Sequence, residues 1–497
     1  MAINPVPRHI LSKSTFLRGC QCEKALWMYK NEYHLRDETS EAQQAIFNRG
    51  TDVGTLARDL FPRGVDASPI DSFHYQESVM KTSELIQDGN KIIYEAAFQF
   101  EQVLAALDIL VNKSNKWYAY EVKSSTEVKD VHIKDAALQY YVITKSGIQL
   151  EDVFIVHINN QYVRKGAIDL PELVIKQSVK KEVLQLQGYI HEKISELKQV
   201  VASKVKPVKD IGVQCSEPYD CDFMTHCWGH IPDISIFDLV RMNTNKKFEL
   251  YSEGIVEFSQ LHEGHKLTEG QQMQVESYLN KKDYIDISSI RSFLSTIKYP
   301  LHFMDFETFQ SAVPMFDNSK PYQQVPFQFS VHYKNTRDSE LIHKEFLANA
   351  NVDPREEFII SLLKATEQPG TILAYNQSFE ISRLKELSTS FPKYCVEIEE
   401  RISRIMDLMV PFAKRWYYAP AMNGSYSIKA VLPALVPKLN YNDLEISDGG
   451  TASAAYLNLY HNGDAKQVES VRKNLKEYCK LDTLAMVELF RKLENSM

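Results

Sequence analysis

The chain has 497 residues, and at about 150 residues per domain this length predicts two to four domains and excludes a single small one. Hydrophobic residues make up 44% of the sequence and charged residues 25%, a composition that excludes fibrous and disordered proteins. The 65 acidic residues outnumber the 57 basic ones and give a net charge of -8, which argues against a globally basic nucleic-acid coat protein but permits a local basic groove.

Neither a membrane span nor a secretory leader is expected. No apolar run reaches the roughly 18 residues that a transmembrane helix needs. Residues 1–10 contain no charged stretch followed by a hydrophobic one, as a leader would. We therefore expect a cytoplasmic protein with no membrane partner, and the sequence does not identify any protein partner.

The first half of the chain is expected to form an α/β domain over residues 1–230. Apolar periodicity predicts helices over residues 13–61. Runs rich in β-branched and aromatic residues predict strands at 91–100, 103–111 and 116–125. The remaining elements are a helix ending at Gly147, a strand at 153–159 and a long amphipathic helix at 170–202. Helices thus flank a sheet.

A second α/β domain is expected over residues 299–497. Residues 231–298 have helical patches but no apolar run strong enough for a core, so we interpret them as a helical connector or small subdomain. A buried strand, LHFMDFETF, then opens a series of strands and helices that includes the strand TILAYN. The expected fold class is therefore α/β in both halves.

Two carboxylates and a lysine form the first candidate site. Residues two apart in a strand share a face, so Glu121 and Lys123 project together. Asp108 lies on the neighbouring strand of the expected hairpin, where it can lie beside them. Paired carboxylates suit Mg²⁺ or Mn²⁺, and a lysine beside them can position water for phosphodiester hydrolysis. The alternative is a surface salt bridge on an exposed strand.

Three cysteines at intervals of six, Cys215, Cys221 and Cys227, predict a metal site. A tetrathiolate site needs a fourth ligand, for which Cys22 is the better candidate and Cys20 the alternative. Zinc and a 4Fe-4S cluster both accept four thiolates, and the spacing does not choose between them. The remaining two thiols are expected to be buried apolar side chains, at Cys395 and Cys479.

A second set of acids lies in the C-terminal domain. Asp305 and Glu307 share one face of an apolar strand, where unpaired burial would be costly without a cation. Glu380 lies one turn inside the helix expected after TILAYN, and Tyr478 and Asp482 have the four-residue spacing of one helix face. Four carboxylates can hold two metal ions for attack on phosphate, while Tyr478 orients or deprotonates the water.

The first domain resembles the PD-(D/E)XK nuclease superfamily, and within it the RecB-like branch that includes AddB-type and CRISPR-associated nucleases. The resemblance implies a restriction-endonuclease-like core with Asp108, Glu121 and Lys123 as catalytic residues. It also implies that Gln139 and Tyr140 on the next helix support the substrate and that Glu95 is an extra metal ligand. Many members carry an early metal-ligating His, which residues 49–60 lack.

The cysteine pattern resembles the iron-sulfur staple of such nucleases. This resemblance implies that Cys22, Cys215, Cys221 and Cys227 hold a 4Fe-4S cluster that ties the ends of the domain together.

The second domain resembles the DEDD exonucleases of the ribonuclease H-like fold, tyrosine subtype, with Glu380 where Asp is usual. In that family the four acids bind two metal ions and the tyrosine is the general base. The whole chain resembles a bacterial family of two-nuclease proteins.

Together these resemblances imply a metal-dependent nuclease acting on nucleic acid, with DNA, as single strands or ends, favoured over RNA. Two alternatives stay open. In the first, only the C-terminal exonuclease is active and the N-terminal domain is a nucleic-acid-binding scaffold. In the second, the protein binds nucleic acid without catalysis.

Overall fold

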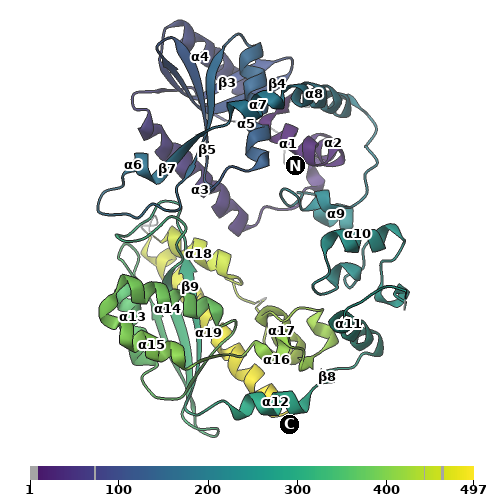
Figure 1. The fold of residues 1–497 in the computed structure, drawn as a ribbon, viewed down its shortest axis with the longest axis vertical. Helices are drawn as coiled ribbons and strands as arrows, with labels where there is room; N and C mark the ends of the chain where they lie inside the picture. The colour runs from purple at the N-terminus through teal and green to yellow at the C-terminus, as the bar shows by residue number, and fades with distance from the viewer. Residues whose placement is uncertain (1–8, 72–73, 263, 442, 460–463) are drawn as a thin grey trace. The chain divides into compact units, whose positions relative to one another are not determined.

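The computed structural model describes residues 9–71, 74–262, 264–441, 443–459 and 464–497. The expectation that the chain begins without a leader rests mainly on residues 1–8, which lie outside these ranges. The chain divides into two compact units, and each is discontinuous in sequence. The first comprises Met1–His230 with Ser311–Tyr322, and the second comprises Ile231–Gln310 with Gln323–Met497. Both are mixed α/β structures (Figure 1).

The sheet of the first unit has the strand order β2-β3-β4-β5-β6-β7, and β1 pairs with β4 outside this path. Neighbours β3, β4 and β5 are antiparallel and occupy the three stretches expected to be strands, whereas β5 and β6 are parallel. The strands are β1 (Leu11–Ser12), β2 (Val65–Asp66), β3 (Ile92–Phe100), β4 (Val103–Lys113), β5 (Lys116–Lys123), β6 (Leu150–Ile158) and β7 (Val174–Ser178).

Helices α5 and α8 supply much of the apolar surface that covers this sheet. Ala137, Leu138 and Val142 of α5 are fully buried in the same core as Ile190 and Leu197 of α8. The helices of the unit are α1 (Lys13–Gln21), α2 (Glu23–Asn31), α3 (Glu41–Ala57), α4 (Tyr75–Gln87), α5 (Asp130–Lys145), α6 (Leu170–Leu173), α7 (Lys180–Gln185), α8 (Gln187–Ala202) and α9 (Met224–Trp228).

The single helix expected over residues 170–202 is wrong. The structure divides this stretch into α6, the strand β7, α7 and α8. Strand β7 pairs antiparallel with β6 along the edge of the sheet, and most of its residues are exposed. The backbone hydrogen bonds of this pairing override the local helical pattern.

Residues 311–322 belong to the first unit although the chain on both sides of them belongs to the second. The guanidinium of Arg164 donates to the carbonyl oxygens of Pro314 and Met315 at 3.0 and 2.7 Å. The backbone N–H of Gly166 donates to Asp317. Apolar packing adds to these bonds, because Ala312 is buried in a cluster with residues of β6.

The main sheet of the second unit has the strand order β11-β10-β9-β12-β13. Strands β9, β10 and β11 are successively antiparallel, whereas β12 and β13 run parallel to β9. A short pair, β8 with β14, lies apart from this sheet. The strands are β8 (Tyr284–Ile285), β9 (Leu301–Phe309), β10 (Val325–Lys334), β11 (Leu341–Leu347), β12 (Thr371–Ala374), β13 (Ile405–Asp407) and β14 (Tyr417–Tyr418).

Two helical layers cover opposite faces of this sheet (Figure 1). Met304 and Phe306 of β9 share a core with α13, α14 and α15, while the neighbouring Phe303 packs edge-on against Phe490 of α19. The helices of the unit are α10 (Thr244–Ser252), α11 (Glu269–Asn280), α12 (Ile287–Ser295), α13 (Arg355–Ala365), α14 (Ser378–Ser390), α15 (Cys395–Ser403), α16 (Val410–Ala413), α17 (Ile428–Leu435), α18 (Gly449–Asn458) and α19 (Ala465–Glu494).

Residues 231–298 are grouped with the second unit and have an apolar core of their own. Ile236, Leu239 and Phe258 are at most 2% exposed. The amide of Gln274 on α11 bridges the N–H of Val240 and a backbone carbonyl. The expectation that this stretch lacks a core is therefore wrong, because its apolar residues are spread over several short elements rather than one run. In the described part of the chain, no helix is long and apolar enough to cross a membrane.

Candidate functional site

Strand β9 presents two carboxylates to helix α19. Alternation along the strand places Asp305 and Glu307 on the face that also carries Phe303 and Phe309. Phe303 packs against α19 and Phe309 against Tyr456 of α18. Aromatic contacts before and after the two carboxylates therefore hold this part of β9 against α19 and α18.

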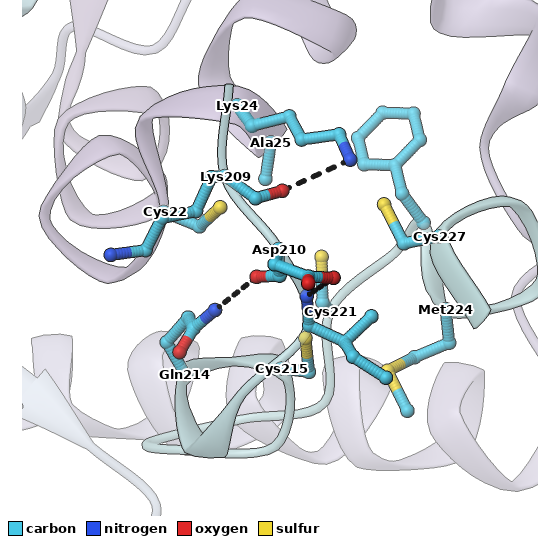
Figure 2. A pocket seen from close by; sticks show the side chains of 12 residues that line it. Cys22, Lys24, Ala25, Lys209, Asp210, Gln214, Cys215, Cys221, Met224 and Cys227 are labelled. Carbon is cyan, nitrogen blue, oxygen red and sulfur yellow. Dashed lines mark hydrogen bonds between the residues drawn. The ribbon is translucent and has the colours of Figure 1, made fainter. Parts of the chain in front are cut away.

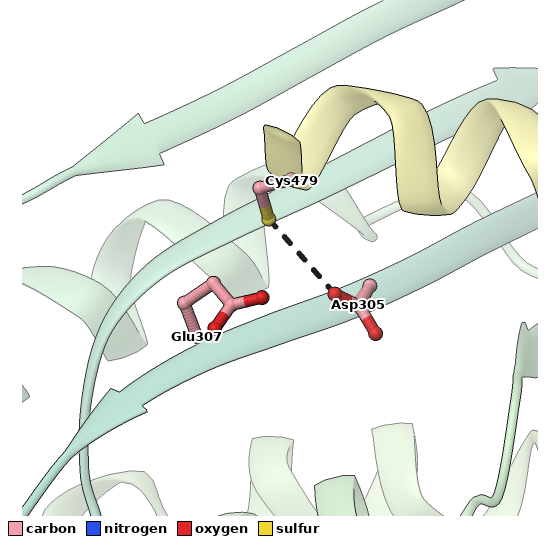
Figure 3. Close-up of side chains that lie close together, drawn as sticks. All are labelled: Asp305, Glu307 and Cys479. Carbon is pink, nitrogen blue, oxygen red and sulfur yellow. Dashed lines mark hydrogen bonds between the residues drawn. The ribbon is translucent and has the colours of Figure 1, made fainter. Parts of the chain in front are cut away.

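Helix α19 carries Asp482, Tyr478 and Cys479 toward these two carboxylates, and Tyr441 approaches from outside this helix. The Oδ1 atom of Asp482 accepts a hydrogen bond from the Tyr441 hydroxyl at 2.7 Å, and the Tyr478 hydroxyl also donates to this carboxylate. The thiol of Cys479 lies 4.0 Å from Oδ2 of Asp305 (Figure 3). One ligand atom each from Asp305, Glu307 and Cys479 lies within 4.8 Å of the others, and among the described residues no other three acid, thiol or imidazole donors lie this close together.

Glu380 approaches from α14. Asn376, with a φ of 69°, turns the chain out of β12, and the carboxylate of Asp407 accepts the N–H groups of Asn376 and Met409 at 2.9 Å each. Asp407 thereby holds the turn that begins α14. Glu380 is 2% exposed, and its Oε2 has no hydrogen-bond partner in the described structure. Glu380 is not part of the group formed by Asp305, Glu307 and Cys479, but its charge helps to raise the pKa of Asp305.

Burial gives all four carboxylates of this acid site raised pKa values. It raises the pKa of Asp482 to about 7 and that of Glu380 to about 8. Burial and then the Asp482 charge raise the pKa values of Asp305 and Glu307 well above their usual range. Because clustered buried acids resist ionisation together, this set of donors suits bound cations, which would supply the missing positive charge.

Three residues at this site were not expected from sequence. Lys429 of α17 lies 5.6 Å from the ring of Tyr441 and 5.5 Å from that of Tyr478, and its charge opposes the rise in the pKa of Glu307. Cys479 is buried, as expected, but faces carboxylates rather than an apolar core. In the sequence, only the position of Cys479 next to Tyr478 could have indicated that the thiol lies at the site. Tyr441 and Lys429 belong to other elements, and no local pattern links them to the site.

In the first unit, three acids lie close enough to act on one another. Asp108 precedes Ile109, which pairs with Tyr94 and with Tyr120, and the charges of Glu121 and Glu95 both act on Asp108. Oδ2 of Asp108 accepts the N–H of Val122 at 2.5 Å. Burial, followed by the Glu121 charge, raises the pKa of Asp108 to about 7. Glu95 pairs with Arg58 at 3.2 Å, and burial raises its pKa.

A second lysine, Lys13 at the start of α1, also enters this site. Its Nζ lies 2.6 Å from Oε1 of Glu121, and Lys123 contacts the same oxygen at 2.7 Å. Lys123 also pairs with Asp135 of α5 at 2.6 Å. Burial opposes ionisation of Glu121, but Lys123 and Lys13 more than offset it and lower its pKa. The site is therefore an ionic cluster in which lysines already neutralise Glu121.

The two supporting residues on α5 have different surroundings. Gln139 donates to Asp135 at 3.1 Å, and its own carbonyl oxygen is buried without a partner in the described structure. Tyr140 packs at the margin of the hydrophobic core. Lys13 and Asp135 were not expected because nothing local marks them, and Lys13 is 108 residues from Glu121.

The four cysteines named as cluster ligands line one pocket (Figure 2). Cys22 lies at the junction of α1 and α2, Cys227 on α9, and Cys215 and Cys221 on the segment before it. Burial raises the pKa of Cys22, and that of Cys221 to about 11. Cys20 is placed elsewhere, beside Tyr189. A four-thiolate donor set is one that zinc or an iron-sulfur cluster accepts.

One stretch of the chain is similar to a described family. Residues 302–427 match a family described as Domain of unknown function (DUF2779). This stretch contains Asp305, Glu307 and Glu380 and ends before Tyr441.

The chain is also similar to curated proteins without an assigned function. It is 28% identical over 214 residues to uncharacterized protein UU173 of Ureaplasma parvum serovar 3, covering 37% of this chain and 30% of that protein. It is 28% identical over 234 residues to the uncharacterized protein MG366 homolog of Mycoplasma pneumoniae, covering 43% and 35%. The chain thus spans about a third of the length of these relatives.

Proposed function

We propose that the protein is a metal-dependent nuclease that hydrolyses phosphodiester bonds of DNA, with its principal active site in the second unit. The observation that carries this proposal is the buried group of Asp305, Glu307, Glu380 and Asp482, whose raised pKa values and unpartnered oxygens suit divalent cations. The strand order β11-β10-β9-β12-β13 supports a ribonuclease H-like fold, since it has an antiparallel meander followed by two strands parallel to its first.

The residues of the second site have separable roles. Bound Mg²⁺ or Mn²⁺ would neutralise charge on the transferring phosphate and activate water. Burial and the Asp482 charge raise the pKa of Tyr478 in the metal-free protein. With the neighbouring carboxylates neutralised by cations, Tyr478 would orient or deprotonate the attacking water. Lys429, beside both tyrosine rings, adds positive charge at the same face.

The first unit is proposed to be a PD-(D/E)XK-like domain that binds nucleic acid. The ion pair of Lys13 with Glu121 favours the scaffold alternative, since an ammonium group already contacts the carboxylate that would hold a metal ion. The acids Asp108, Glu121 and Glu95, whose charges act on one another, support the alternative in which both sites are active. Comparing single-site variants separates the two.

A 4Fe-4S cluster is proposed at Cys22, Cys215, Cys221 and Cys227. The supporting observation is that these four thiols line one pocket. In a 4Fe-4S cluster each thiolate would bind a different iron atom, and zinc, which also accepts four thiolates, is the alternative.

The test is Mn²⁺-dependent degradation of end-labelled DNA and RNA oligonucleotides by the full-length protein and by Asp305→Ala and Lys123→Ala variants. We expect DNA to be degraded, with activity lost in Asp305→Ala. Loss in Lys123→Ala as well would make the first site catalytic, whereas retained activity would make it a scaffold. Absence of hydrolysis of either substrate, or activity insensitive to both substitutions, would contradict the proposal and favour nucleic-acid binding without catalysis.

A further inference from the structure

A cysteine lies among the carboxylates of the second unit. Cys479 is fully buried on α19, and its sulfur is 4.0 Å from Oδ2 of Asp305. A ligand atom of Glu307 completes a group in which all three donors lie within 4.8 Å of one another. Figure 3 shows the thiol directed toward the strand that carries both carboxylates. The nuclease proposal assigns no role to this thiol.

Burial is costly for the carboxylates beside Cys479. Glu307 is only 7% exposed, and both its burial and the nearby charge of Asp482 oppose its ionisation. Oδ2 of Asp482, one turn along α19 from Cys479, is buried without a partner in the described structure. Because burying an unpaired carboxylate is expensive, these carboxylates indicate a missing cation independently of the cysteine.

The distances suit one ion bound to sulfur and oxygen together. Zinc binds thiolate at about 2.3 Å and carboxylate oxygen at about 2.1 Å in tetrahedral geometry, which places the two ligand atoms roughly 3.6 Å apart. The Cys479 sulfur lies 4.0 Å from Oδ2 of Asp305, so a movement of about 0.4 Å lets both atoms bind one ion. Sulfur ligands favour soft or borderline ions such as Zn²⁺ and Cd²⁺, whereas Mg²⁺ prefers oxygen alone.

We propose that Asp305, Glu307 and Cys479 form a mixed oxygen and sulfur site that binds a thiophilic divalent ion in preference to Mg²⁺. As the sulfur–metal bond forms, the thiol proton leaves to solvent, so that a thiolate binds the ion. This inference rests on the proposed function for the presence of a metal ion at these carboxylates and adds the chemical class of that ion. It predicts that Zn²⁺ or Cd²⁺ competes with Mg²⁺ at this site.

The test is a Cd²⁺ titration of the full-length protein, followed by the ultraviolet sulfur-to-metal charge-transfer absorption. Wild type is compared with Cys479→Ser, with Asp305→Asn, and with Cys395→Ser as a matched control outside the site. The five cysteines of the first unit, Cys20, Cys22, Cys215, Cys221 and Cys227, contribute the same background to each protein. We expect both site variants to lose one component of the absorption and to bind Cd²⁺ at least about tenfold more weakly. Cys395→Ser should match wild type, and Mg²⁺ affinity should change less than about twofold in Cys479→Ser.

Wild-type absorption and Cd²⁺ affinity in Cys479→Ser would overturn the inference. So would a loss in that variant alone with Asp305→Asn unchanged, since the ion would then not be shared with the carboxylate. Circular dichroism checks folding, and if Cys479→Ser is unfolded, Asp305→Asn decides the outcome. If the Cd²⁺ signal depends on both residues but no hydrolysis occurs with Mn²⁺, the nuclease proposal fails and the metal site stands.

Discussion

Replacing Asp482 by Asn is expected to stabilise the metal-free protein at pH 8, and this gain should disappear as the pH falls toward 4. Burial raises the pKa of Asp482 from 3.8 to about 7. The folded protein therefore holds a proton that the unfolded chain releases, so stability falls as the pH rises through this interval. At about 1.4 kcal/mol per pH unit, the interval corresponds to at most about 4 kcal/mol. The Asn side chain keeps an acceptor oxygen for the Tyr441 hydroxyl.

The assay is thermal unfolding in the presence of a chelator, at a series of pH values. For a unit of 150–250 residues, 4 kcal/mol corresponds to a rise in Tm of about 8–16 °C as an upper limit. Asp338→Asn, which replaces an exposed aspartate in the same unit, is the matched control and should leave Tm unchanged. Mn²⁺ should raise the Tm of wild type at pH 8 more than that of Asp482→Asn. A variant no more stable than wild type at pH 8 would refute the claim that this buried charge is costly.

Three further predictions concern other residues. Tyr441→Phe removes a hydrogen bond to a buried carboxylate and should destabilise the protein by about 1–3 kcal/mol in chemical denaturation above pH 7. Cys22→Ser should abolish the visible absorption and iron content of anaerobically purified protein, whereas Cys20→Ser should retain both; the reverse result would exchange the two as ligands. Lys13→Met should lower stability by about 1–3 kcal/mol and create tighter Mn²⁺ binding in the first unit, measured calorimetrically in an Asp482→Asn background. Unchanged Mn²⁺ affinity would show that the lysine does not occupy a cation position.

Local patterns were sufficient for the elements that carry the second site. The alternation in LHFMDFETF predicted a strand with Asp305 and Glu307 on one face, and the structure has β9 there. The four-residue spacing of Tyr478 and Asp482 predicted a shared helix face. Both residues lie on α19, where the Tyr478 hydroxyl donates a hydrogen bond to the Asp482 carboxylate. Such predictions succeed because the periods of strands and helices depend only on neighbouring residues.

Contacts between distant segments could not be predicted in this way. The ion pair of Lys13 with Glu121 depends on how α1 packs beside the sheet, which no local pattern encodes. The edge strand β7 lies in a stretch rich in lysine that reads as helix, and only its pairing with β6 makes it a strand. Cys479 was interpreted as an apolar thiol because a cysteine next to a candidate tyrosine does not reveal which way it points.

The exchange of chain between the two units affects how the protein can be divided. Residues 311–322 leave the second unit directly after the strand that carries its acids and return before β10. A fragment starting at residue 231 would expose Ala312, which is 2% exposed in the intact chain, and a fragment ending at 230 would leave the guanidinium of Arg164 without its carbonyl partners. Recombination that replaced one unit alone would therefore damage the other, so the two are expected to be inherited as a single piece.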